Sequence, residues 1–169
     1  GMDFNVMKMA AVVHVMRDGK PHAVKEFVDI YDTPTMCTVL KEAYPMVEGI
    51  YVYPDASGRN SSSKSYSETD FAILEREGFE IVSDTKNPAV KDRVQSMNAM
   101  FCNAKGERNY FVNVAECPNY VEALEQQVYN ERGEPDKKAG LDHVTDAPGY
   151  FIVREFPIER HQFGNHVSG

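Results

Sequence analysis

Residues 49–58 read Gly-Ile-Tyr-Val-Tyr-Pro-Asp-Ala-Ser-Gly, and the fold we expect follows from this stretch. Ile50–Tyr53 is a β-branched and aromatic run, which is the composition of a buried strand. Pro54 has no N–H to donate to a neighbouring strand, so we expect strand pairing to end there. Asp55 then lies at the carboxyl end of the strand, where open α/β sheets bind ligands. A carboxylate in that position can hold a divalent cation through its oxygens.

The chain before this strand predicts an antiparallel meander and then a helix. Three segments have the apolar spacing of strands: Met2–Val6, Met9–Met16 and Ala23–Tyr31. Arg17-Asp18-Gly19-Lys20 supplies a hairpin turn, because Asp-Gly favours the tight turns that join antiparallel strands. Thr33 and Pro34 predict a helix start, with the threonine as N-cap and the proline in the first helical position. We expect that helix to end near Tyr44.

Helices and strands alternate along the rest of the chain. In order, we expect a helix from a capping box at Ser67–Asp70 to Gly78, a strand at Phe79–Val82, a helix opened by Asn87-Pro88, a strand at Asn109–Val114, and helices at Pro118–Tyr129 and Leu141–Phe156. This order predicts an α/β fold with a mixed sheet of five to six strands, three antiparallel strands followed by parallel ones, and helices on both faces. Residues 2–156 would form one domain, and residues 157–169 a polar tail.

The length, composition and net charge of the chain disfavour some classes of function. The chain has 169 residues, 42% of them hydrophobic, which suits one globular domain with a single good core. A formal net charge of −8 disfavours a module that coats nucleic acid by itself, but it does not disfavour a metal-dependent enzyme acting on phosphates. No apolar run approaches the length of a membrane helix, and we expect no secretory leader. Three cysteines without CxxC spacing favour a reduced, cytoplasmic setting.

Acidic residues from three separate parts of the chain are the candidates for a metal site. Asp3 lies on the first predicted strand, and Asp55 follows the fourth. Asp142 and Asp146 share one face of the last predicted helix, and His143 lies three residues before Asp146. If this helix docks its apolar stripe on the sheet, its polar edge points toward the strand ends. Two or three carboxylates meeting there suit Mg²⁺ or Mn²⁺, and two such ions can activate a water and stabilise the leaving oxygen of a phosphodiester.

Each of these residues also has an ordinary structural interpretation. Asp3 would serve equally well as a surface acid on a terminal strand. Asp55 would serve as the residue that initiates a turn, and Asp142 as the N-cap of its helix. A lone histidine such as His143 is more often a surface residue than a ligand. Spacing alone leaves both interpretations open.

Three stretches together carry a family resemblance. They are Met-Asp-Phe-Asn-Val at residues 2–6, Tyr-Pro-Asp-Ala-Ser-Gly at 53–58, and Gly-Leu-Asp-His-Val-Thr-Asp-Ala-Pro-Gly-Tyr-Phe at 140–151. The chain resembles the nuclease domain of the large terminase subunit of tailed bacteriophages, a member of the RNase H-like superfamily. The resemblance covers about residues 2–155, and the closing stretch is its most specific part.

The resemblance implies a divalent-metal-dependent endonuclease that cuts double-stranded, concatemeric DNA during phage genome packaging. Asp3 and Asp55 match the family's first two metal-binding acids, and Asp142, His143 and Asp146 fall in its closing motif. The implied cofactor is Mg²⁺ or Mn²⁺, bound as a pair. The implied partners are double-stranded DNA, an upstream ATPase motor domain, the portal and the small terminase subunit, with no membrane. The implied setting is the cytoplasm of a bacterial host that carries the phage or prophage.

One departure from the family pattern affects the closing motif. Pro148 falls where the family usually continues a helix, and a proline there removes the bond to the carbonyl of Val144. Which of Asp142, His143 and Asp146 reaches the metal therefore stays open; we favour the two aspartates, with the histidine as a ligand or proton-transfer group. Two other functions remain compatible: another RNase H-like nuclease, such as a junction resolvase or transposase core, and a non-catalytic assembly domain.

Overall fold

A long hairpin lies at the centre of the structure, a computed structural model that describes residues 1–5, 7–46, 49–60, 68–131, 135 and 142–158. Its strands are β2 (Met9–Arg17) and β3 (Lys20–Ile30), which pair antiparallel as predicted. Asp18 and Gly19 both have positive φ, 52° and 73°, which is the backbone of the tight turn that Asp-Gly favours. Strand β1 (Met2–Asp3) pairs antiparallel with β2, and β6 (Phe111–Val112) lies parallel to β3. These strands form a four-stranded sheet in the order β1-β2-β3-β6.

A second, two-stranded sheet contains β4 (Tyr51–Val52) and β5 (Glu80–Ile81), which run parallel. The prediction of one sheet with five to six strands is therefore wrong, although the antiparallel and then parallel strand directions are confirmed. An isolated parallel bridge between Met2 and Pro54 connects the two sheets. The prediction that pairing ends at Pro54 is also wrong. The bridge uses the Tyr53 carbonyl and the Asp55 N–H, each 3.0 Å from its partner atom on Met2, so the missing N–H of Pro54 is not needed.

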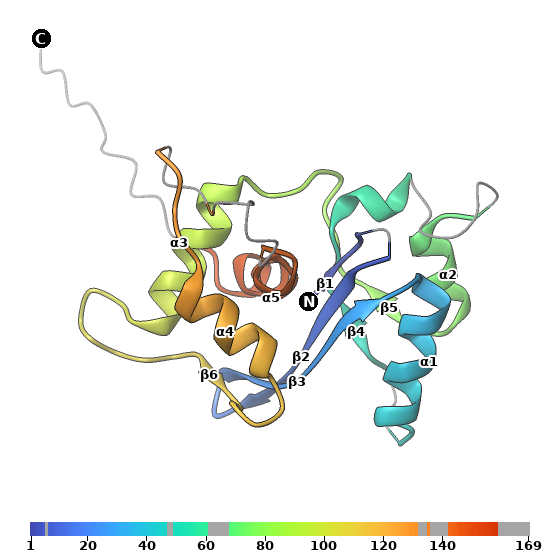
Figure 1. Cartoon of the computed structure of the whole chain (residues 1–169), viewed down its shortest axis with the longest axis horizontal. Coiled ribbons are helices and arrows are strands. Elements are labelled where there is room, and N and C mark those ends of the chain that lie inside the picture. The colour runs from blue at the N-terminus through green and yellow to red at the C-terminus, as the bar shows by residue number, and fades with distance from the viewer. Residues whose placement is uncertain (6, 47–48, 61–67, 132–134, 136–141, 159–169) are drawn as a thin grey trace, which may run out of the picture.

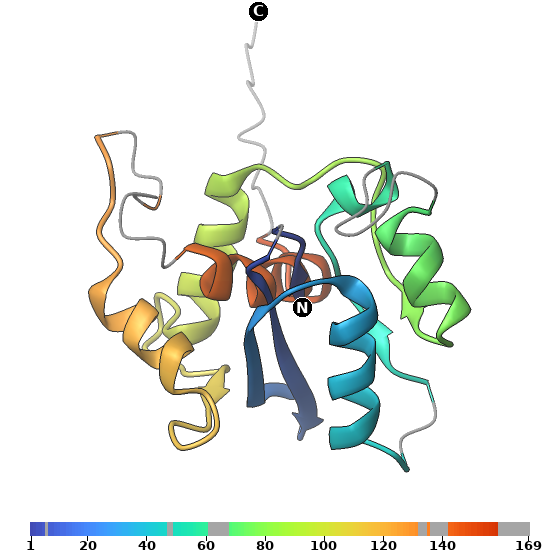
Figure 2. The same ribbon diagram turned by 45° about the vertical axis from the view of Figure 1, so that its right-hand side comes forward.

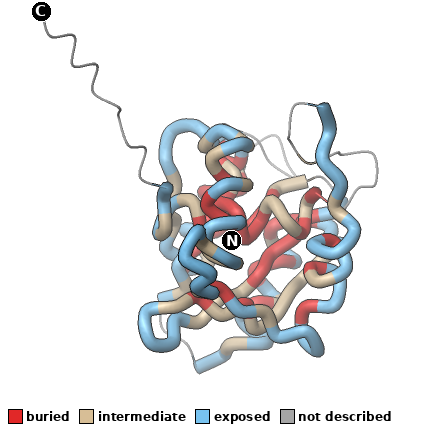
Figure 3. Tube along the Cα trace, turned by 90° about the vertical axis from the view of Figure 1, so that its left-hand side faces the viewer, coloured by how far each residue is buried: buried red, intermediate tan, exposed pale blue. Residues whose placement is uncertain are grey.

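Helices cover both sides of the strands, as predicted (Figures 1 and 2). One group contains α1 (Thr33–Ala43) and α2 (Asp70–Arg76), and the other contains α3 (Val90–Phe101), α4 (Pro118–Gln126) and α5 (Asp142–Glu155). Strand β2 separates the two groups because its successive side chains point to opposite faces. Met9 and Ala11 pack with the first group, whereas Ala10 and Val12 pack with the second. Buried segments accordingly run through the middle of the molecule (Figure 3).

The helix starts differ in detail from the sequence predictions. Asp32, not Thr33, caps α1: its backbone is extended, and its Oδ1 accepts a hydrogen bond from the Thr35 N–H at 2.9 Å. Thr33 is buried and donates its hydroxyl proton to Asp70 Oδ1 at 2.6 Å. Thr69 caps α2 through its hydroxyl, so the helix does not begin from a cap at residue 67, which lies outside the described residues. In both helices the capping side chain accepts a hydrogen bond from the N–H three residues later, that of Thr35 in α1 and that of Ala72 in α2.

The last helix, α5, runs from Asp142 to Glu155 with Pro148 inside it. Pro148 is buried, and the helix continues on both sides of it. The proline therefore does not restart the helix, and the closing motif lies on one continuous element. Among the described helices, none is long and apolar enough to cross a membrane. Cys37 and Cys117 are buried and Cys102 is exposed, all three with free thiols. The expected polar tail lies almost entirely outside the described residues.

Candidate active site at the end of β1

The first carboxylate, Asp3, is paired with a histidine from the far end of the chain. Asp3 ends β1 and is 7% exposed. Its Oδ2 lies 3.0 Å from Nδ1 of His143, on the first turn of α5, and Asn5 Nδ2 lies 2.7 Å from the other ring nitrogen, Nε2. Because the amide nitrogen of Asn5 can only donate, Nε2 accepts, and Nδ1 carries the proton that it donates to Asp3. The pair fixes both the tautomer and the orientation of the His143 ring.

The second carboxylate, Asp55, lies directly after the bridge that joins the two sheets. It begins a single 3₁₀ turn, η1 (Ala56–Arg59), and its Oδ1 accepts from the Ser57 N–H at 2.8 Å. The same oxygen accepts from Asn87 Nδ2 at 2.6 Å, and Asn87 Oδ1 in turn accepts from the Ala56 N–H at 2.8 Å. Asp55 is thus a turn-initiating residue, the structural role noted for it above. Asn87 holds the carboxylate in place from a distant segment of the chain.

The third carboxylate, Asp146, faces a buried arginine. Arg93 on α3 places Nη2 3.2 Å from Asp146 Oδ1 and is itself only 6% exposed. Its guanidinium carbon also lies 4.5 Å from the centre of the Tyr150 ring, one turn along α5 from Asp146. The fourth predicted acid, Asp142, is buried at the start of α5, with Oδ1 4.0 Å from His143 Nε2. The two acids of α5 therefore have different surroundings.

The electrostatics of Asp3 link these groups into one site. Burial raises the pKa of Asp3 to about 6, against the hydrogen bond and charge of His143, which favour the ionised form. The charges of Asp146 and Asp55 raise the pKa further, so both carboxylates lie within electrostatic reach of Asp3. The same three acids raise the pKa of Tyr150, whose largest upward shift comes from burial. Asp3 and His143 are thus in contact, Asp55 and Asp146 lie within electrostatic reach of Asp3, and Asp142 lies beside His143.

Four residues of this site were not predicted from the sequence: Asn5, Asn87, Arg93 and Tyr150. Arg93 had the clearest signal, because it lies among the apolar positions of the α3 stripe, where a charged residue is unexpected. Tyr150 is four residues after Asp146 and so shares its helix face. Asn87 was assigned to a helix start, but α3 begins three residues later without a side-chain cap.

The donor atoms of the site suit a hard divalent cation, but the side chains are not arranged around one. Within the described ranges, no group of three or more His, Cys, Asp or Glu side chains is placed to hold a metal ion. The reason is that each carboxylate faces a different partner: Asp3 faces His143, Asp55 faces Asn87, and Asp146 faces Arg93. Carboxylate oxygens are the ligands that Mg²⁺ and Mn²⁺ prefer, and the raised pKa of Asp3 reflects its burial first and the charges of Asp146 and Asp55 to a smaller extent. The donor atoms therefore fit such a cation by their chemistry, while each carboxylate has another partner in this structure.

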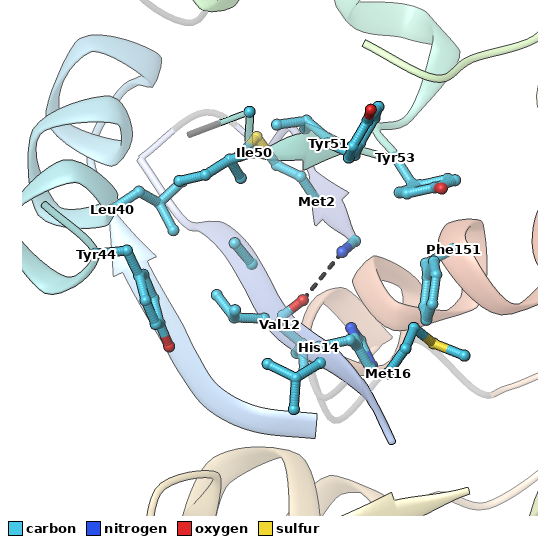
Figure 4. Close-up of a pocket in the computed structure, with 16 residues that line it drawn as sticks. Met2, Val12, His14, Met16, Leu40, Tyr44, Ile50, Tyr51, Tyr53 and Phe151 are labelled. Atoms are coloured by element: carbon cyan, nitrogen blue, oxygen red, sulfur yellow. Dashed lines mark hydrogen bonds between the residues drawn. The ribbon is translucent and has the colours of Figure 1, made fainter. Parts of the chain in front are cut away.

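A separate apolar cavity lies beside the start of β1, where Gly1 and Met2 line it. Its volume is about 290 Å³, and it lies between β2, β4 and the part of α5 that carries Phe151 (Figure 4). Aliphatic and aromatic side chains line most of it, with His14 beside Phe151. None of the five predicted site residues lines it. We therefore assign the candidate chemistry to the acidic site and not to this cavity.

We expect Asp3→Asn to stabilise the protein at pH 8 and to change its stability little at pH 4. The folded-state pKa of Asp3, about 6, lies above its ordinary value of 3.8, so the folded protein holds this proton more tightly than the unfolded chain. The stability that the proton provides is present below about pH 4 and is lost as the pH rises through about 6. The expected gain at pH 8 is on the order of 1–3 kcal/mol. Denaturant unfolding at both pH values measures it.

The matched control for this experiment is Asp18→Asn. Asp18 is exposed at the hairpin turn, where asparagine also tolerates a positive φ. The difference in unfolding free energy between the Asp18→Asn protein and the wild type should be the same at pH 4 and at pH 8. An Asp3→Asn protein that is less stable than the wild type at pH 8 would show that the contact with His143 outweighs the burial of the charge.

Comparison with solved structures defines the fold as that of large-terminase nuclease domains. The P22 large terminase nuclease domain matches with a TM-score of 0.63 at 17% identity, over 92% of this chain and 80% of that one. The large terminase nuclease domain of bacteriophage SPP1, solved with bound Mn, matches with a TM-score of 0.60 at 16% identity, over 91% and 83%. A large terminase from a thermophilic bacteriophage matches with a TM-score of 0.68 at 19% identity, over 90% of this chain. The chain spans only 38% of that last protein.

The family model for the terminase RNaseH-like domain matches residues 1–155. The chain therefore belongs to this family, which the sequence resemblance had indicated. Among curated proteins, no match is found.

Proposed function

We propose that this chain is the nuclease domain of a phage large terminase and cuts double-stranded DNA concatemers during genome packaging with the help of Mg²⁺ or Mn²⁺. The observation that carries the proposal is the contact between Asp3 of β1 and His143 of α5, with Asp55 and Asp146 within electrostatic reach of Asp3, in a member of the terminase RNaseH-like family. The SPP1 nuclease domain, which shares the fold, was solved with bound Mn.

In this proposal each group has a distinct task. Asp3, Asp55 and Asp146 hold the metal, with Asp142 as a further candidate ligand beside His143. A bound divalent cation, or a pair of them, would activate water and stabilise the charge that develops on the phosphodiester. Asn87 and the Ser57 N–H orient the Asp55 carboxylate through one of its oxygens. His143 is anchored on Asp3 through Nδ1; as a proton-transfer group it would accept a proton at Nε2 in place of the Asn5 hydrogen bond, and its side chain is 31% exposed.

The proposed partners follow from the family. They are double-stranded DNA, an ATPase domain elsewhere in the full large terminase, the portal and the small terminase subunit, in the cytoplasm of a bacterial host. The net charge of −8 is unfavourable for autonomous DNA binding. The isolated domain should therefore hold DNA weakly and without marked sequence preference, and other parts of the machinery would supply most of the affinity.

Cleavage of supercoiled plasmid is the direct test of this function. We expect nicked and linear products in Mn²⁺ or Mg²⁺, and intact plasmid when EDTA removes the metal. Linear duplex should be cut at least as well as a four-way junction. A strong preference for the junction would indicate a resolvase, and the absence of both cleavage and metal binding would indicate an assembly domain.

A further inference from the structure

Arg93 occupies an unusual position beside the acidic site. It is a fully charged side chain at physiological pH, yet it is only 6% exposed. Of its three side-chain nitrogens, Nη2 contacts Asp146 Oδ1 at 3.2 Å. Nε and Nη1 are buried and have no hydrogen-bond partner among the described residues. The face of the Tyr150 ring, 4.5 Å from the guanidinium carbon, supplies its other favourable contact.

This arrangement is costly for a residue with a purely structural role. A buried guanidinium loses its hydration, and N–H groups left without an acceptor add to that penalty. The Asp146 carboxylate is the charge that compensates Arg93, and both line a cavity of about 320 Å³ between α3, α4 and α5. The carboxylate end of the pair thus remains within reach of solvent. Its side chain is 17% exposed, compared with 7% for Arg93.

Arg93 and a metal ion are alternative partners for Asp146. The oxygen that Nη2 contacts is one of only two that Asp146 can offer to a cation. A divalent ion bound among Asp3, Asp55 and Asp146 would also be repelled by a guanidinium in contact with one of its ligands. Both effects act in the same direction, because each lowers the affinity of the site for metal.

We propose that Arg93 is a positioning residue that serves as the counter-ion of Asp146 in the metal-free protein and sets the metal affinity of the site by competing for that carboxylate. This inference rests on the proposed metal-dependent function. It assigns to Arg93 a role that none of the predicted site residues has. The contact holds the Asp146 carboxylate in place until a metal displaces the guanidinium.

The test is calorimetric titration of Mn²⁺ into the wild type and a set of arginine variants. Arg93→Gln keeps a donor for Asp146 and removes the charge, and Arg93→Met removes both. Both should bind Mn²⁺ about tenfold more tightly than the wild type, which corresponds to about 1.4 kcal/mol. Arg93→Lys keeps the charge and should restore an affinity close to that of the wild type. Thermal unfolding without metal reports which variants remain folded.

The matched control is Arg154→Met, which removes an exposed arginine from the same helix as Asp146. Arg154 pairs with Asp84, so its loss should leave Mn²⁺ affinity within about twofold of the wild type. If the Mn²⁺ affinity of Arg93→Gln equals that of this control or is lower, Arg93 does not compete with the metal for Asp146 and has only a structural or orienting role. If the wild type itself binds no Mn²⁺, the proposed metal site fails, and the competition fails with it.

Discussion

Asp55→Asn is expected to abolish metal-dependent cleavage of plasmid DNA while leaving the protein folded. The change removes one negative charge from the site with almost no change in volume. In the proposed mechanism Asp55 holds the cation, and asparagine offers a neutral, weaker oxygen in its place. We expect the rate to fall by at least about 10²- to 10³-fold, comparable to the loss of one preorganised electrostatic group in other enzymes.

The surroundings of Asp55 explain why the fold should tolerate the change. Its Oδ1 accepts from the Ser57 N–H and from the Asn87 amide, and an asparagine Oδ1 can accept both bonds. The free energy of unfolding should therefore change by no more than about 0.5–1 kcal/mol. Plasmid nicking in Mn²⁺ and thermal unfolding measure the two effects separately. Cleavage at the wild-type rate by a folded Asp55→Asn protein would remove this residue from the active site.

The matched control is Asp84→Asn. Asp84 is an exposed acid in the segment before α3, paired with Arg154 on the surface. Its replacement also removes one negative charge, so it tests whether cleavage depends on total charge or on the position of Asp55. We expect cleavage to stay within about twofold of the wild type, because exposed ion pairs contribute little.

The largest loss of stability is expected for Ile152→Ala. Ile152 lies on α5 with 0% exposure, in the cluster that joins this helix to β2, α3 and α4. Truncation removes three buried carbons and leaves a cavity, which costs about 2–5 kcal/mol in comparable cores. Because α5 also positions His143 and Asp146, this variant should lose cleavage at temperatures where it begins to unfold. Denaturant unfolding followed by circular dichroism measures the change.

Val153→Ala, one residue further along α5, is the control for this effect. Val153 is only partly buried and lies outside the buried cluster, so its truncation should cost about 1 kcal/mol or less. Ile152→Val should lie between the two, at about 0.5–1.5 kcal/mol. Equal midpoints for Ile152→Ala and Val153→Ala would mean that α5 is held by its polar contacts rather than by this cluster.

The sequence predicted the elements that local patterns determine. The Asp-Gly turn between β2 and β3, the apolar stripes of the helices and the motif at the start of α5 each depend on neighbours within a few residues. The predictions of the helix caps were wrong where several neighbouring residues have side chains that suit an N-cap. Asp32 and Thr33 both suit the N-cap of α1, and only the backbone of the folded chain shows that Asp32 accepts from Thr35 while Thr33 turns to Asp70.

The site contacts that were missed are all long-range. Asn5 meets His143 across 138 residues, and Asn87 meets Asp55 across 32. Asn5 carries no local pattern that sets it apart from a surface residue, and the pattern at Asn87-Pro88 indicated a helix start instead. Arg93 differs, because a charge on the apolar face of α3 could have been recognised as needing a buried counter-ion, although the pattern does not identify Asp146 as the partner.

The bridge between Met2 and Pro54 has a geometric consequence for the two strand-borne acids. Asp3 follows Met2 and Asp55 follows Pro54, and Met2 and Pro54 are the two residues of the bridge. The two backbone hydrogen bonds of Met2 therefore fix the position of the Asp3 backbone relative to that of Asp55. Met2 points into the cluster beside α1 and α2, whereas Asp3 points to His143 on the opposite face. A slip of one residue would reverse both side chains, burying the carboxylate among methionine and leucine side chains. The register that these two backbone hydrogen bonds set thus keeps Asp3 on the face of β1 that carries the acidic site, next to the strand end that carries Asp55.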